Sequence, residues 1–90
     1  MLKPHVVSTD SFLCFELLDA RGDRVDSTVV TKRHPHDVLH FFPSAQAYLD
    51  DASAQLQTLL TRHADALDFD AAIEARTEAE FTLYREVNGM

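Results

Sequence analysis

Apolar and polar residues alternate in the first third of the chain, and this pattern predicts β-strands. The clearest stretch is 12–18, in which Leu13, Phe15 and Leu17 alternate with less apolar neighbours. Because successive side chains on a strand point to opposite faces, this segment should bury one face and half-bury the other.

Two further strands are expected on either side of this one. Residues 5–7 form a short β-type run that ends in turn formers, and 25–33 is rich in β-branched residues. The turn at 20–24 contains Gly22, which can take the positive φ that tight hairpins need. An antiparallel hairpin or a three-strand meander should therefore form at the N-terminus.

The pattern changes near residue 34. Pro35 suits the first turn of a helix, and the apolar residues at 38–42 give such a turn something to bury before Pro43 stops it. A short helical turn should thus connect the sheet to the next element.

A long amphipathic helix is predicted over 44–63, where apolar positions recur at helical spacing. Its apolar seam consists of Ala45, Leu49, Ala52, Leu56, Leu59 and His63, widened by Tyr48 and Leu60. Two heptads are too few to indicate a coiled coil, but the seam could also form a helix–helix dimer contact.

The last segment predicts a second helix, capped by Asp68 or Asp70 and ended by Asn88-Gly89. Residues 80–87 are also rich in β formers, so an added C-terminal strand is the alternative. A helix is favoured because no turn residue separates Ala79 from Phe81.

These elements predict one small α+β domain over residues 1–90, in which the sheet packs against two C-terminal helices. The expected core comprises Leu13, Phe15, Leu17, Val29, Leu49, Leu56, Leu59, Ile73 and Leu83.

Charge is concentrated in the second half of the chain. The net charge is −7, and residues 43–90 hold nine acidic and three basic residues, against six and five in residues 1–42. Direct nucleic-acid binding is disfavoured because phosphate contacts require a basic patch. The expected partner is a basic protein, or a nucleic-acid-binding protein complex.

The acidic residues of this half are the candidate partner-binding site. They are Asp50, Asp51, Asp65, Asp68, Asp70, Glu74, Glu78 and Glu80. Asp70, Glu74 and Glu78 follow one another at helical spacing with no basic residue four positions on, whereas Arg76 and Glu80 can pair. A plain solvated face is the alternative interpretation.

Histidines cluster at 34–40. If 36–40 is helical, His36 and His40 lie one turn apart, a spacing that can hold a transition metal. The chain has no Cys pair and no HExxH motif, so we expect His34, His36 and His40 to form a polar junction and predict no cofactor.

Enzymatic motifs are otherwise missing, and we predict no catalytic residue. No glycine-rich phosphate loop or GxSxG motif occurs, and the single Cys14 lies in an apolar run where a buried thiol is expected. No stretch approaches the ~20 apolar residues of a membrane helix, and no signal-peptide-like region follows the N-terminus. A cytoplasmic protein without membrane contact is expected.

In size and charge the chain resembles small inhibitors, such as phage-encoded anti-CRISPR proteins and immunity proteins against nucleases, although it shares no motif with them. The leading hypothesis is therefore a non-enzymatic inhibitor or antitoxin-like protein that occupies a basic, nucleic-acid-binding surface. The alternatives are a structural subunit that assembles, as a homodimer or within a complex, through the apolar seam, and a metal-dependent factor built on the histidines.

Overall fold

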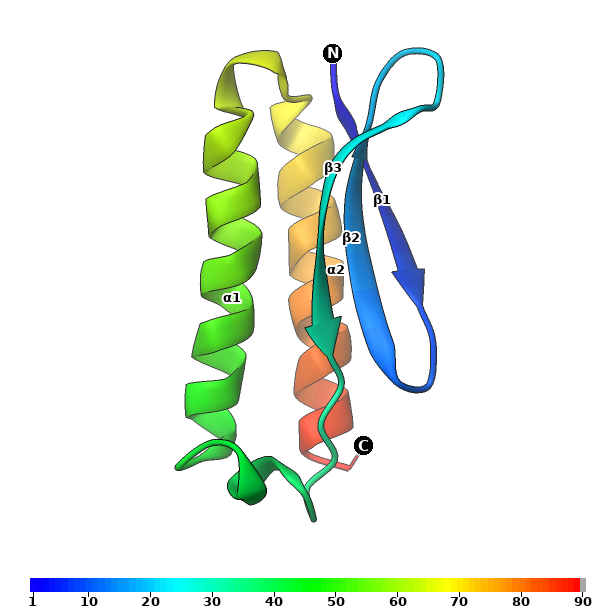
Figure 1. The fold of residues 1–90 in the computed structure, drawn as a ribbon. Helices are drawn as coiled ribbons and strands as arrows, with labels where there is room; N and C mark the ends of the chain where they lie inside the picture. The colour runs from blue at the N-terminus through cyan, green and yellow to red at the C-terminus, as the bar shows by residue number, and fades with distance from the viewer. Residues whose placement is uncertain (90) are drawn as a thin grey trace.

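The fold is a three-strand antiparallel sheet followed by two helices (Figure 1), described by a computed structural model for residues 1–89. The predicted α+β class and the meander are therefore confirmed. The strands are β1 (Lys3–Ser8), β2 (Phe12–Leu18) and β3 (Arg24–Thr31). The long helices are α1 (Ala45–Arg62) and α2 (Phe69–Val87), and the short 3-10 turns are η1 (Val38–His40) and η2 (Ala64–Ala66).

The sheet has the order β1-β2-β3, with both connections made by short turns. In the second turn, Asp19 Oδ1 accepts hydrogen bonds from the backbone N–H groups of Arg21 and Asp23. Gly22 takes a φ of 86°, in the left-handed region that favours glycine. The predicted hairpin turn is confirmed.

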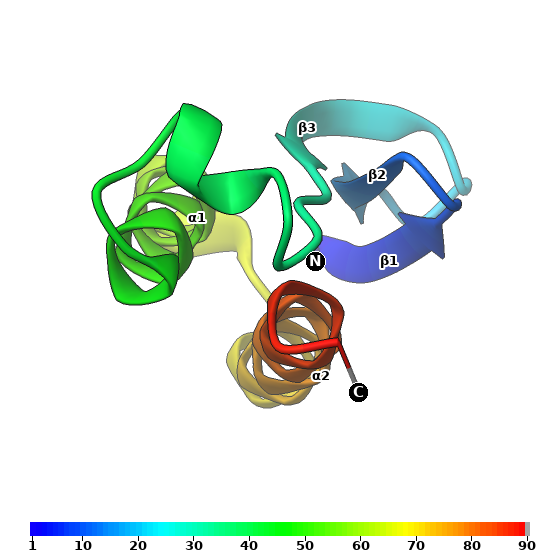
Figure 2. The ribbon, with the colours of Figure 1, turned by 90° about the horizontal axis from the view of Figure 1, so that it is seen from below.

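The two helices cover one face of the sheet and lie beside each other, as the end-on view shows (Figure 2). Helix α1 packs against β3, and α2 packs against β1. The phenol of Tyr48 fastens α1 to the end of β3 by donating a hydrogen bond of 2.8 Å to the Thr31 carbonyl. Among residues 1–89, no helix is long and apolar enough to cross a membrane.

The core lies between the sheet and the helices. One face of β2 contributes Leu13, Phe15 and Leu17, all fully buried, as the alternation predicted. The helices contribute mainly Tyr48, Ala52, Leu56, Leu59, Ala72, Ala79, Leu83 and Val87. The predicted Leu49 lies partly buried against this core.

Two predicted core residues are exposed instead. Val29 is 53% exposed because it pairs with Cys14 on the face of the sheet away from the helices. Its neighbour Val30 pairs with the buried Leu13 and is only 3% exposed, so Val30 is the core residue of this strand. The prediction for Ile73 is also wrong, because it lies at the border of the α2 apolar face and is 43% exposed.

Both helices begin at the residues that the sequence indicated. Ser44 Oγ accepts from the N–H of Ala47, and Asp68 Oδ1 accepts from the N–H of Ala71, so each caps its helix. Helix α2 continues to Val87 and ends before Gly89, which takes a φ of 72°. The alternative strand at 80–87 does not form.

The apolar seam of α1 lies inside the molecule, where most of it is buried against the sheet. A dimer contact through this seam, as considered from the sequence, would therefore require the domain to open.

Candidate functional site

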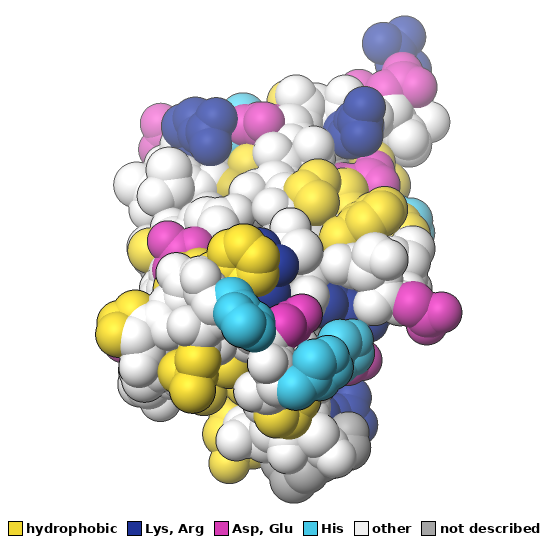
Figure 3. Space-filling view, turned by 60° about the horizontal axis from the view of Figure 1, so that its bottom comes forward, with side chains coloured by type: hydrophobic (Ala, Val, Ile, Leu, Met, Phe, Trp, Pro, Cys, Tyr) yellow, Lys and Arg dark blue, Asp and Glu magenta, His cyan; other side chains and the backbone are white. Residues whose placement is uncertain are grey.

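The histidine junction lies at the end of the molecule where β3 leads into η1. Space-filling side chains show histidines gathered here around acidic groups (Figure 3). The rings of His34 and His36 stack in parallel with centroids 5.7 Å apart, while the 3-10 turn that contains His40 begins only at Val38. His36 and His40 are thus not one α-helical turn apart. Within residues 1–89, no three His, Cys, Asp or Glu side chains are grouped to hold a metal ion.

Glu86 ties this junction to α2. One carboxylate oxygen lies 3.5 Å from Nζ of the buried Lys32, and the other lies 3.5 Å from Nδ1 of His34. A buried ammonium requires such a partner, so Lys32 and Glu86 have a structural role.

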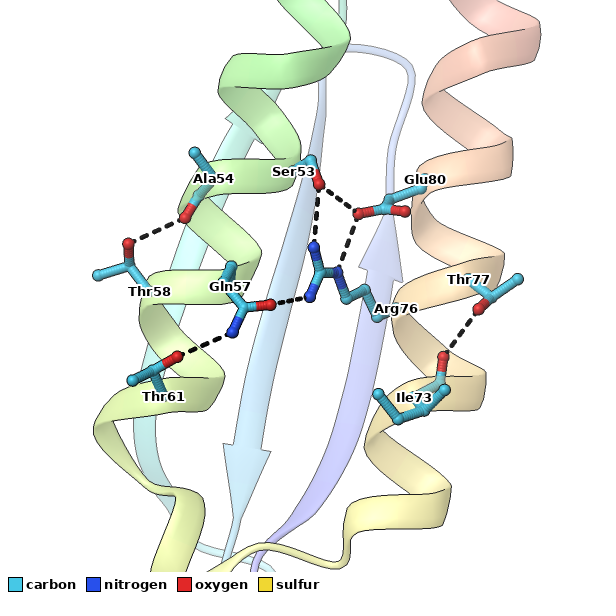
Figure 4. Close-up of polar contacts among 9 residues, drawn as sticks. All are labelled: Ser53, Ala54, Gln57, Thr58, Thr61, Ile73, Arg76, Thr77 and Glu80. Atoms are coloured by element: carbon cyan, nitrogen blue, oxygen red, sulfur yellow. Dashed lines mark hydrogen bonds and ion pairs between the residues drawn. The ribbon is translucent and has the colours of Figure 1, made fainter.

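A polar network joins the two helices on their solvent-facing side (Figure 4). Arg76 of α2 donates from Nε to Glu80 Oε1 over 2.9 Å, as the sequence spacing predicted, and from Nη2 to Ser53 Oγ over 3.0 Å. It also donates from Nη1 to Gln57 Oε1. Ser53 in turn donates to Glu80 over 2.9 Å. One guanidinium therefore cross-links α1 and α2, a contact that the sequence could not place because Ser53 and Gln57 are distant in the chain.

Two depressions lie on either side of this network, and together they form what we call the helix groove. The first, the Phe69 depression, has a volume of about 180 Å³ and is lined by Leu60, Leu67, Phe69, Ala72, Ile73 and Arg76, with polar residues of α1. The second, the Tyr84 depression, has a volume of about 350 Å³. It is lined by Gln46, Leu49, Asp50, Ala52, Ser53, Glu80, Phe81, Leu83 and Tyr84.

Large apolar side chains project along this groove without cover. Phe69, Ile73, Phe81 and Tyr84 all belong to α2, and each is between 43% and 67% exposed. The sequence did not predict this row because apolar residues at helical spacing indicate a buried face, and Ile73 was expected in the core. Exposed apolar rows with a polar rim are typical of interaction surfaces.

The predicted acidic stripe, consisting of Asp70, Glu74 and Glu78, runs along the outer side of α2. All three residues are exposed, and none forms an ion pair with another residue among 1–89. At helical rise, residues four apart are separated by ~6 Å along the axis. The stripe is therefore a regular row of uncompensated carboxylates.

The other predicted partner-binding residues do not join this row. Asp68 caps α2 and Glu80 belongs to the Arg76 network, so both carboxylates have internal roles. Asp50 lines the Tyr84 depression. Asp51 instead lines a separate hollow, together with Gln55 of α1 and Thr28 of β3. Asp65 is exposed in η2. The eight residues thus divide among several surfaces, and one continuous acidic face does not form.

A separate ionic cluster holds the C-terminus of α1 to β3. Nε2 of His63 lies 2.8 Å from Oδ2 of Asp26, and Nη1 of Arg62 lies 3.3 Å from the same oxygen. The hydrogen bond to His63, together with the backbone N–H of Ser27 and the charge of Arg62, holds the pKa of Asp26 below its usual value.

Cys14 lies in the sheet, on the face away from the helices, between Val7 and Val29 of the adjacent strands. It is buried, and this burial, together with the nearby charge of Glu16, raises the pKa of the thiol. A raised pKa lowers the thiolate fraction, which makes the thiol less reactive.

Comparisons with protein-family models, with curated proteins and with solved structures find no match to this chain.

Proposed function

We propose that this protein is a non-enzymatic inhibitor that binds a basic, nucleic-acid-binding surface of another protein with the solvent-facing side of its helix pair. The acidic stripe would approach the basic surface, and the helix groove beside it would accept side chains of the partner. Nucleic acid and the inhibitor would then compete for the same cationic residues.

The observation that carries this proposal is the row formed by Asp70, Glu74 and Glu78. Like charges at this spacing repel and cost a few tenths of a kcal/mol each in an isolated helix. Arg76 does not compensate these charges, because its guanidinium donates to Glu80 and to Ser53 of α1. Asp70 lies in the first turn of α2, where the helix dipole offsets this repulsion, but Glu74 and Glu78 lie beyond that turn. The row provides a potential that attracts a cationic partner and speeds encounter.

The exposed apolar residues of the helix groove supply the second support. Charged rims set the encounter rate and specificity, whereas desolvated aromatic and apolar anchors provide most of the binding free energy at an interface. In this chain the two kinds of surface lie on the same helix, since Phe69, Ile73, Phe81 and Tyr84 share α2 with the acidic stripe.

A second copy of the chain fits this surface poorly on electrostatic grounds. Each copy carries a net charge of −7, so a contact through α2 would bring two acidic rows together. A cationic partner removes that repulsion.

The test is competition with nucleic acid. A partner is captured from lysate on the immobilised protein, purified, and loaded with a fluorescent oligonucleotide. Addition of the free protein should release the oligonucleotide in proportion to the partner bound. A ternary complex that retains the oligonucleotide, or a partner with no nucleic-acid affinity, would overturn the inhibitor function.

A further inference from the structure

The Tyr84 depression combines features that suit one kind of side chain. We propose that it receives an arginine side chain of the partner protein. This inference rests on the proposed function and assigns to it a specific contact: the guanidinium would lie at the carboxylates of Asp50 and Glu80, with its aliphatic stem on the apolar floor.

The floor of the depression is apolar. Leu49, Ala52 and Leu83 line it, and Ala52 and Leu83 are also part of the core. Arginine and lysine bury their methylene stems along such surfaces while the charged group reaches a polar rim. The volume of about 350 Å³ falls in the range of sites that hold small ligands.

The rim carries the carboxylates of Asp50 and Glu80, and each has one oxygen that accepts no hydrogen bond from residues 1–89. Asp50 accepts a hydrogen bond from Gln46 at Oδ1, and Glu80 accepts from Ser53 and Arg76 at Oε1. Within residues 1–89, neither Oδ2 of Asp50 nor Oε2 of Glu80 has a hydrogen-bond partner. These two oxygens can accept from an incoming cation through charge-assisted hydrogen bonds.

Aromatic rings complete the site. The rings of Phe81 and Tyr84 lie nearly parallel, with centroids 6.3 Å apart. The guanidinium of Arg85 already lies 4.9 Å from the Phe81 centroid, so the ring of Tyr84 is the one that should meet an incoming guanidinium. Arginine is preferred to lysine because its planar, weakly hydrated group stacks on aromatic faces.

The Phe69 depression provides an internal comparison. It is also apolar, but its charged lining residue is Arg76, and no Asp or Glu among residues 1–89 lines it. A cation should therefore select the Tyr84 end of the groove, and an apolar side chain of the partner should suit the Phe69 end.

The test uses the isolated protein and a small probe, arginine capped at both ends as N-acetyl-arginine methylamide. Backbone amide signals are followed by NMR during titration at millimolar probe, with capped citrulline as the isosteric uncharged control. Capped arginine should give saturable shifts at Ser53, Phe81 and Tyr84, and capped citrulline should give none there. Equal shifts with both probes, or shifts spread over all acidic surfaces, would overturn the proposal.

Two adjacent substitutions provide the matched variants. Asp50→Asn removes the rim charge, whereas Asp51→Asn makes the same change on the other side of α1. Both residues are exposed, and both side chains are hydrogen-bonded only to a glutamine four residues away in the same helix, so neither change should unfold the protein. We expect D50N to lower the affinity for capped arginine about threefold to tenfold, and D51N to leave that affinity unchanged. Equal effects would contradict the assigned site.

Failure here is distinguishable from failure of the proposed function. The probe measures only the Tyr84 depression of the free protein, whereas competition with nucleic acid measures the whole surface. A protein that displaces nucleic acid but ignores capped arginine would retain its function and lose this contact. If the protein dimerises and D50N abolishes the dimer, the depression belongs to a contact between two copies. That result would overturn the proposal that it receives an arginine of another protein.

Discussion

Arg76 of α2 donates a hydrogen bond of 3.0 Å from Nη2 to Oγ of Ser53 on α1. The same guanidinium reaches Glu80 and Gln57, and its side chain is mostly shielded from solvent. Because the contact lies between the two depressions of the helix groove, it fixes the spacing of the helices at the surface where we place the partner.

Removal of this side chain should loosen the helix pair. Arg76→Ala leaves the Glu80 carboxylate with only Ser53 as its donor and takes away the cross-link between α1 and α2. We expect a loss of about 1–3 kcal/mol in the free energy of unfolding, measured by urea denaturation. Arg76→Lys should restore only part of this loss, since an ammonium cannot reproduce the fork of donors. An unchanged urea midpoint for R76A would show that the network is not formed in solution.

The register of β3 can be tested with two neighbouring valines. Val30→Ala deletes buried methyl groups opposite Leu13 and should cost about 1–3 kcal/mol. Val29→Ala is the matched control, because the same deletion at a side chain that is mostly exposed should cost below about 0.5 kcal/mol. Urea denaturation of both variants gives the comparison. A larger loss for V29A than for V30A would mean that the strand presents its other face to the helices.

Acid should reveal the contribution of Asp26. Its pKa is lowered in the folded protein, chiefly by the hydrogen bond to His63, so folding favours the ionised carboxylate. The stabilisation is therefore fully present above the unfolded value of ~3.9 and is lost as the pH falls through that value toward the lowered folded pKa. Asp26→Asn should destabilise the protein near neutral pH, and the difference from wild type should shrink below about pH 4.

The measurement for Asp26 is the urea midpoint of both proteins across the acid range. Asp10→Asn, at an exposed carboxylate in the β1–β2 turn, serves as the control and should follow wild type throughout. A gap between D26N and wild type that stays constant with pH would contradict the pairing with His63.

Much of the fold follows from local patterns in the sequence. The alternation in β2 and the helical spacing in α1 specify faces directly, because each buried residue lies at the expected period from the next. The start of α1 at Ser44 was predicted, and of the two caps that the sequence allowed for α2, Asp68 and Asp70, the structure uses Asp68.

The core predictions for Val29 and Ile73 were wrong because the sequence pattern does not determine which face of the strand or helix these residues occupy. Val29 and Val30 are adjacent and equally apolar, so only the pairing with β2 decides which one is buried. Ile73 lies at the border of the α2 apolar face, and its exposure depends on how closely α1 approaches. In the candidate site, the helical period identified the acidic stripe, but the separation of Asp50 from Asp51, and the network of Arg76 with Ser53, depend on the packing of α1 against α2.

The most direct test of the central claim is reversal of the acidic stripe. The double variant Glu74→Lys, Glu78→Lys is compared with Asp10→Lys, Asp23→Lys, which makes the same change in net charge at exposed positions of the sheet turns. Affinity for the captured partner is measured by titration at fixed salt, with circular dichroism to check the fold. We predict that the stripe variant binds at least about tenfold more weakly, and that the turn variant stays within about threefold of wild type. Equal losses in both variants, or undiminished binding by the stripe variant, would contradict the account.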